Sequence, residues 1–182
     1  MNINFDPFPV ISTERLVLRP LTLTDNENLL KLRSDERVNR YLDRPPTTTI
    51  EQAKAFIHKI AQVVQDRHGI YWVISRKDEP SLIGTICYRN FNADKASADI
   101  GYELMPTHQG QGLMTEALTG VIKYGFDTMK LKMIIALTHP DNEASARVLK
   151  RNGFVSDERY EFVSKENAEG QKVYVLKHYV SL

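Results

Sequence analysis

The sequence is poor in several features that would define a class of protein. Of its 182 residues only one is cysteine. That residue, Cys87, cannot form an internal disulfide, which agrees with a reducing, cytoplasmic location. No stretch approaches the ~20 apolar residues of a membrane-spanning helix, and residues 1–7 lack the basic and apolar regions of a signal peptide. We therefore expect a cytoplasmic protein with no membrane contact.

An excess of one charge is also missing. The 24 basic and 23 acidic residues are interspersed and leave a net charge of +1, so there is no basic block to follow a phosphate backbone. We expect no direct nucleic-acid partner. The five histidines show no short metal-ligand spacing, so we also expect no metal site. Cys87 lies in the apolar run 82–88, where we interpret it as a small buried side chain rather than a nucleophile.

Strand and helix patterns alternate along the whole chain without a linker or repeat, which predicts one mixed α/β domain over residues 1–182. Strands are expected at 15–20, 70–74, 82–88, 98–104 and 133–138, with a closing hairpin of 160–163 and 173–179. Helices are expected at 24–32, around 38–42, and at 50–64, 113–129 and 142–152. The short spacing of the three middle strands predicts an antiparallel meander, and a βαβ-type tail follows it.

Two glycines open the helix expected at 113–129, in the stretch PTHQGQGLMTEAL. A helix N-terminus carries unpaired N–H groups and a partial positive charge, so Gly110 and Gly112 would let a pyrophosphate approach the backbone. A P-loop is excluded, because Gly112 is followed by Leu113 and Met114 instead of lysine and a hydroxyl residue. A dinucleotide fingerprint is weakly supported, since Thr115 stands where a small residue is required and the preceding strands look antiparallel.

A third interpretation rests on a resemblance. The stretch Gln109-Gly110-Gln111-Gly112-Leu113-Met114 resembles the acetyl-CoA loop of the GCN5-related N-acetyltransferases, the GNAT family. Residues 13–21 resemble the first strand of its RimJ/RimL-type branch, which acetylates ribosomal-protein N-termini. Residues 98–102 resemble the fourth strand, and 142–154 the Asn-x-x-Ser helix that ends in Gly-Phe. Met114 departs from the pattern, which prefers glycine or alanine, and its side chain is expected to point into the helix packing.

The resemblance implies a GNAT fold, an α/β arrangement in which a mixed, mostly antiparallel sheet of six to seven strands is flanked by about four helices. It implies that acetyl-CoA is the co-substrate and that no metal is needed. The implied cofactor contacts are the pantetheine-pairing edge near Glu103, Leu104 and Met105, and the pyrophosphate-binding backbone of Gln109, Gly110, Gln111, Gly112, Leu113 and Met114. Asn142 and Ser145 complete the set.

Three side chains have implied roles beside the donor. Asn142 is the expected N-cap of its helix and a contact to the cofactor or its loop. Ser145 is the candidate general acid for the departing thiolate. A serine is also tolerated in the first turn of a capped helix, and this structural interpretation explains its presence equally well. Glu103 is the best-placed carboxylate to relay a proton from the amine through water, and its plainer interpretation is a solvated acid at a strand end.

The acceptor is left open. An α-amino group titrates near ~8 and a lysine near ~10.4, so a peptide N-terminus needs far less base help. The alternatives are a small-molecule amine, such as a polyamine, an aminoglycoside or an amino-acid-like compound, and a non-catalytic module that only binds acyl-CoA. Residues that select the acceptor are expected in the loops around 35–46 and 164–171. A homodimer formed through sheet edges or the first helices is compatible with the sequence.

Overall fold

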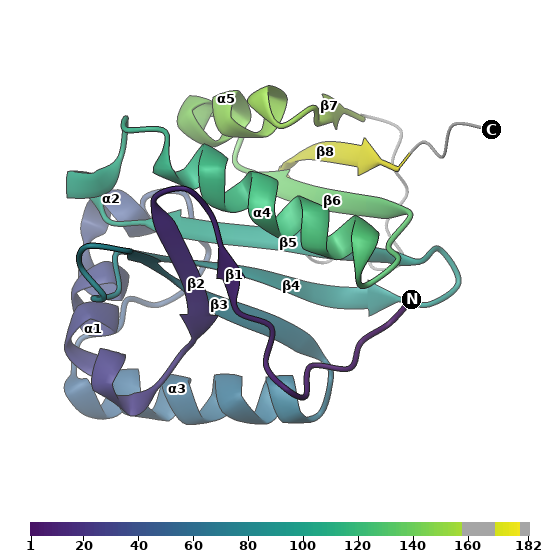
Figure 1. Cartoon of the computed structure of the whole chain (residues 1–182). Helices are drawn as coiled ribbons and strands as arrows, with labels where there is room; N and C mark the ends of the chain where they lie inside the picture. The colour runs from purple at the N-terminus through teal and green to yellow at the C-terminus, as the bar shows by residue number, and fades with distance from the viewer. Residues whose placement is uncertain (158–169, 179–182) are drawn as a thin grey trace.

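A computed structural model describes residues 1–157 and 170–178, which form one eight-stranded sheet with helices on both faces (Figure 1). The strand order is β1-β2-β3-β4-β5-β6-β8-β7. The strands are β1 (Ile11–Ser12), β2 (Leu16–Pro20), β3 (Gly69–Arg76), β4 (Gly84–Asn92), β5 (Ser97–Leu104), β6 (Met133–Thr138), β7 (Val155–Ser156) and β8 (Lys172–Lys177). The helices are α1 (Asn26–Ser34), α2 (Glu36–Asn39), α3 (Ile50–Gln65), α4 (Leu113–Asp127) and α5 (Glu143–Arg151), with 3-10 turns η1 (Leu23–Asp25) and η2 (Pro106–His108).

The middle of the sheet is the antiparallel meander that the spacing predicts. β3, β4 and β5 pair antiparallel in sequence order, with Trp72 opposite Ile86 and Ile86 opposite Tyr102. These strands are rich in β-branched and aromatic residues, which fit a pleated surface covered on both faces. Trp72 and Ile86 are fully buried. The register is therefore strongly specified, because a slip by one residue would turn both side chains to the opposite face.

Different helices cover the two faces of the sheet. α4 crosses one face (Figure 1), and its residues Ala117 and Val121, four apart, pack into the core that contains Trp72. On the other face α1 and α3 lie together, and Ala53 and Ile57 of α3 pack against Val73. The alternation of Trp72 and Val73 between these two cores is the period-2 pattern of a strand buried on both sides.

Local signals set the ends of two predicted helices. The Thr49 hydroxyl accepts a hydrogen bond from the Gln52 N–H at 3.2 Å, and the Gln52 side chain accepts one from the Thr49 N–H at 3.3 Å. This capping box starts α3 where the apolar period begins. At the end of α5, Gly153 has a φ of 83°, and Phe154 N–H bonds back to Leu149 O at 3.1 Å. Glycine closes this helix as predicted, since it adopts the left-handed conformation without cost.

The parallel pair β5 and β6 separates towards its carboxyl end. Pairing runs from Ser97 opposite Met133 to Ile100 opposite Ala136. Beyond that point β5 continues to Leu104 and β6 to Thr138, and the described residues show no further pair between them. β5 stays paired with β4 as far as Leu104. The sheet is therefore split along one edge of β5, and that edge keeps its backbone groups available.

The element count differs slightly from the expectation. Within residues 1–157 and 170–178 the sheet has eight strands instead of six to seven, and there are five α-helices instead of about four. The helix expected around 38–42 is α2, which has four residues, and the strands without a predicted counterpart, β1 and β7, have two residues each. Segments of this length are too short to show a sequence period. The predicted strand 160–163 and residue 179 lie outside the described residues, and β8 supplies the other predicted partner of the hairpin, pairing with β6 and β7.

Gly84→Ala is expected to lower the free energy of unfolding by about 1–3 kcal/mol, because it overpacks the β4–β5 pair. A Cβ at Gly84 would lie 2.6 Å from the backbone oxygen of Glu103, which cannot move without opening the sheet. Gly101→Ala is the matched control, since its nearest neighbour, Cys87 Sγ, would be 3.4 Å away. Urea unfolding measures both variants; equal stabilities would contradict the close approach.

Candidate active site

A pocket of about 330 Å³ opens where β5 and β6 separate. It is lined by α2 and the segment after it, the end of β5, the loop before α4, and α5: Arg37, Val38, Tyr41, Leu42, Tyr102, Glu103, Leu104, His108, Gln109, Gly110, Gly112, Leu113, Met114, Thr115, Asn142, Ala144, Ser145, Arg147, Val148 and Arg151. All site residues named from the sequence lie in this lining except Met105 and Gln111. Four residues of the expected acceptor loop 35–46 also line it, while most of 164–171 lies outside the described residues.

The loop before α4 presents its backbone to the pocket. Gly110 and Gly112 have φ values of 75° and 76°, a conformation that favours glycine. Glutamine side chains hold the loop from within: Gln109 Nε2 donates to Leu104 O at 2.9 Å, and Gln111 Nε2 to Thr107 O at 3.1 Å. Gly112 is the N-cap and offers no side chain to the first turn of α4. The N–H groups of that turn are therefore available to an anionic ligand.

An ion pair fastens this loop to the turn between β1 and β2. Arg15 Nε donates to Glu116 Oε2 at 2.6 Å, and an Arg15 terminal nitrogen donates to Gln111 O at 3.0 Å. The other Glu116 oxygen accepts from the Arg15 N–H and the Thr13 hydroxyl. Burial alone would raise the pKa of Glu116, but the hydrogen bonds from Thr13 and Arg15 hold it below its ordinary value. The sequence showed no sign of this clamp, because its partners are 101 residues apart.

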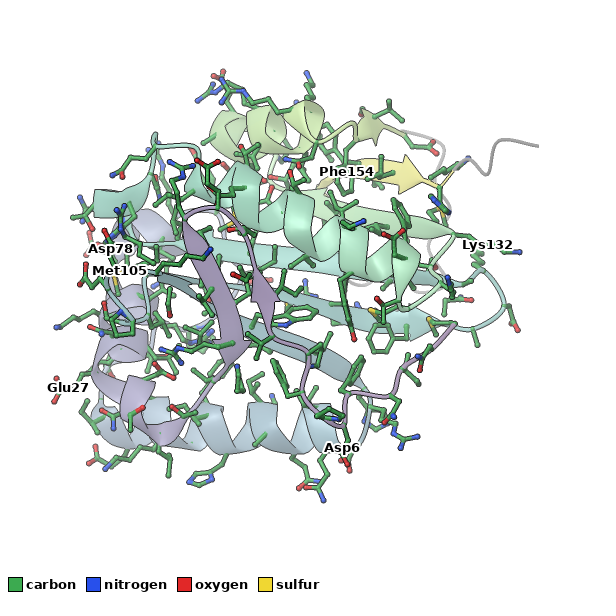
Figure 2. All side chains as sticks on the ribbon, in the orientation of Figure 1. Asp6, Glu27, Asp78, Met105, Lys132 and Phe154 are labelled. Atoms are coloured by element: carbon green, nitrogen blue, oxygen red, sulfur yellow. The ribbon has the colours of Figure 1, made fainter. Side chains whose placement is uncertain are left out.

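Met114 and Met105 both pack against the hydrophobic cores, although Met114 also lines the pocket. Met114 is 7% exposed and packs in the core under α4, as expected for the residue that departs from the family pattern. Met105 lies where the chain leaves β5 (Figure 2) and packs against the α1 and α3 core. Its N–H donates to Ile83 O at 2.9 Å. Among the predicted edge residues, Met105 therefore has its backbone donor already in use.

Asn142, Ser145 and Tyr102 form a connected group at the start of α5. Asn142 Oδ1 accepts from the Ser145 N–H at 3.1 Å, which confirms the predicted N-cap. The Ser145 hydroxyl lies 2.9 Å from the Tyr102 hydroxyl. Burial raises the pKa of Tyr102 to about 12, so this phenol stays protonated at neutral pH. We did not predict Tyr102 as a site residue, since the sequence places it only on a strand.

Glu103, the next residue of β5, faces the opposite side of the sheet. One carboxylate oxygen accepts from Arg44 at 2.5 Å, and the other accepts from Arg44 and Thr85 at 3.3 Å. A second guanidinium, on Arg33, lies 3.7 Å away. With its side chain 9% exposed, Glu103 is not a solvated strand-end acid. Its role as a general base stays a prediction.

Three further expectations concern a metal site, a membrane-spanning helix and the Cys87 thiol. Among residues 1–157 and 170–178, no three histidine, cysteine, aspartate or glutamate side chains are grouped as a metal site would require. Within the same residues no helix is long and apolar enough to cross a membrane. Burial raises the pKa of the Cys87 thiol to about 11, so it carries little thiolate at neutral pH.

Comparison with known proteins gives this arrangement a class. The family model "Acetyltransferase (GNAT) domain" matches residues 15–155. The chain is 39% identical to the uncharacterized N-acetyltransferase YoaA of Bacillus subtilis (strain 168) over 147 residues, covering 81% of this chain and 83% of the relative. It is 27% identical to the [ribosomal protein uS5]-alanine N-acetyltransferase of Escherichia coli (strain K12), covering 79% and 77%.

A solved structure shares the fold. The structure of Mycobacterium smegmatis RimJ in complex with CoA-disulfide superposes with a TM-score of 0.79 at 19% identity, covering 93% of this chain and 87% of that one. The chain belongs to the GNAT family of N-acetyltransferases.

Glu116→Gln is expected to destabilise the protein more at pH 7 than at pH 3.5. A carboxyl whose pKa is lowered by folding stabilises the folded state above its unfolded pKa, near 4.5, and this contribution is lost as the pH falls through the folded value. Urea unfolding at the two pH values measures the difference. Glu27→Gln, at an exposed side chain (Figure 2), is the control and should show no such change. If Glu116→Gln lowers the free energy of unfolding by the same amount at both pH values, the stabilising contacts of Glu116 with Arg15 and Thr13 are contradicted.

Proposed function

We propose that this N-acetyltransferase transfers the acetyl group of acetyl-CoA to the N-terminal amine of a protein, with a ribosomal protein as the first candidate. The observation that carries the proposal is the meeting of two features in one pocket, the backbone-lined helix start at Gly112 and the Ser145–Tyr102 hydroxyl pair. The name of the Escherichia coli relative supports the choice of acceptor.

The donor is expected to lie along the split in the sheet. Its pyrophosphate would accept hydrogen bonds from the N–H groups of the loop and of the first turn of α4, where the helix dipole adds favourable charge. Its pantetheine arm would pair with the β5 edge between Gly101 and Leu104, which β6 leaves unpaired. Leu104 O already accepts from Gln109, so the arm depends on the other groups of this edge.

The reaction itself is a direct attack. The neutral amine forms a bond to the thioester carbon, the carbon–sulfur bond breaks, and the amine loses a proton while the thiolate gains one. The Ser145 hydroxyl would give the proton to the thiolate, and the Tyr102 hydroxyl, which is protonated at neutral pH, would replace it; the proton that the amine releases would pass through water and restore Tyr102. Protonating the thiolate stabilises the leaving group at the point where negative charge develops.

The charges of the pocket favour an α-amine over a more basic acceptor. Glu103 is the one carboxylate among the described lining residues, and it is already paired with two arginines. An acceptor that depends on a strong base, such as a lysine with a pKa near ~10.4, would find little help from these residues. A peptide N-terminus near ~8 needs much less, because a substantial fraction is neutral in the cell.

Titration calorimetry with acetyl-CoA, with NAD and ATP as controls, tests the donor site. Gly112→Glu should weaken acetyl-CoA binding at least about tenfold, because the carboxylate repels the pyrophosphate. Gly112→Gln has the same shape and the same unfavourable φ without the charge, so it should bind more tightly than the glutamate variant. Equal affinities of all three proteins, or tighter binding of NAD or ATP, would contradict the donor assignment.

Turnover of a peptide with a free N-terminal alanine tests the acceptor, against the same peptide with a blocked N-terminus and one internal lysine, and against spermidine. Acetylation of the free peptide alone supports the proposal. Preferred acetylation of spermidine would point to a small-molecule acceptor. Binding of acetyl-CoA with no turnover of any amine would point to a non-catalytic module.

Ser145→Ala is expected to lower kcat by about 10²-fold with little change in the Kd of acetyl-CoA, because it removes the proton donor while Asn142 still caps the backbone N–H. Tyr102→Phe should lower kcat less, since Ser145 can then exchange its proton with water. Steady-state kinetics and calorimetry measure the two quantities. Wild-type turnover in Ser145→Ala would leave the serine as a helix residue only.

A further inference from the structure

The stretch that runs from α2 into the loop before α3 bridges the split in the sheet. Its residues Arg37, Val38, Tyr41 and Leu42 line the pocket. On one side the Tyr41 ring stacks on His139, in the loop after β6, with the ring centroids 5.2 Å apart. On the other side Arg44 reaches Glu103 on β5. We call residues 37–44 the bridging segment. They contact β5 through Glu103, and through His139 they contact the loop that follows β6.

The Arg44–Glu103 contact is bidentate and mostly buried. Two terminal nitrogens of Arg44 donate to the two Glu103 oxygens, and the side chains are 20% and 9% exposed. The same guanidinium donates to Asn39 Oδ1 at 3.0 and 3.2 Å, while the Asn39 amide donates to Arg33 O at 2.7 Å. Paired donors of this kind fix direction as well as distance. Arg44 thus holds the bridging segment in one position relative to β5.

Arg33 makes Glu103 the common counter-charge of two cations. The Arg33 guanidinium lies 3.9 Å above the Phe56 ring and donates to the Thr47 hydroxyl at 3.1 Å. Burial and the neighbouring charge of Arg44 lower the pKa of Arg33. A change at Glu103 that removes its charge would leave two buried guanidinium groups facing each other, which strongly disfavours the folded arrangement of this segment.

We propose that Arg44 and Glu103 are positioning residues for the amine acceptor: together they hold the bridging segment as the wall against which the acceptor is placed. The inference rests on the proposed function for its kinetic consequence, but not for its structural one. It assigns Glu103 the role of holding Arg44 and thereby a wall of the pocket, in place of a carboxylate that takes up the proton of the amine.

The structural consequence is measured without a substrate. In Arg44→Met and in Glu103→Gln, backbone amides of residues 37–44 should exchange hydrogen at least about tenfold faster than in the wild-type protein, while those of α4 and β3 keep their rates. Lys123→Met, which removes an exposed ion pair to Asp127 on α4, is the matched control and should leave the segment unchanged. Unchanged exchange in both Arg44→Met and Glu103→Gln would overturn the proposal, whatever the enzyme acetylates.

The kinetic consequence separates positioning from base catalysis. For the N-terminal alanine peptide, both variants should raise the acceptor KM roughly tenfold, because a displaced wall loses contacts that bind the acceptor equally in the ground and transition states, while the KM of acetyl-CoA stays constant. The double variant should be no worse than either single one, and Arg44→Lys should recover part of the loss.

A base role for Glu103 predicts a different result: kcat falls about 10²-fold in Glu103→Gln, recovers as the pH rises, and changes little in Arg44→Met. That result would overturn the proposal.

Thermal unfolding of each variant shows whether a loss of activity arises only because the variant does not fold. If Glu103→Gln does not fold, Arg44→Met and Arg44→Lys still decide the question, because Glu103 and Arg33 remain paired in both. If the wild-type protein acetylates no amine, the proposed function fails. The hydrogen-exchange measurement still tests whether the Arg44–Glu103 contact holds the bridging segment.

Discussion

The separation of β5 from β6 after Ile100 is the constraint on which the rest of the site depends. A parallel pair that continued to the strand ends would have used the backbone groups of β5 and filled the space with side chains. Because the pairing stops, an unpaired edge faces a pocket, and the loop before α4 and the start of α5 are brought to its two sides. β4 keeps β5 straight and in register through this region, so the split opens without loss of the sheet.

Each side of the split is supported by contacts between segments far apart in the sequence. Arg15 and Glu116 connect the first hairpin to the start of α4, and Tyr41 and His139 connect the bridging segment to the loop after β6. Such contacts add rigidity at the split, where β5 and β6 are not paired with each other. A site for a long, flexible donor benefits from this, since a pre-formed groove reduces the ordering that binding would otherwise require.

Much of the fold and part of the site could be predicted because their signals are local. The capping box at Thr49, the closing Gly153 and the glycine pair at 110 and 112 each lie within a few residues of the structure that they specify. The strand and helix patterns gave the order of the elements, and the resemblance to one family implied the fold and the cofactor contacts. The partners of Glu103 could not be predicted in the same way, because Arg44 is 59 positions away and only the packed sheet brings the two together. Tyr102 was missed for a related reason: a strand pattern gives the face of a residue but not what lies opposite it.

Tyr102 and Glu103 are neighbours on one strand, yet the pleat sends them to opposite sides of the sheet. One joins the hydroxyl pair at α5, and the other joins the arginines behind the bridging segment. In the proposed function, the Tyr102 side of the pocket handles the donor and the Glu103 side faces the acceptor. Under that proposal, a substitution in the bridging segment would change the acceptor half and leave the donor half in place, so the amine could differ while the reaction stays the same.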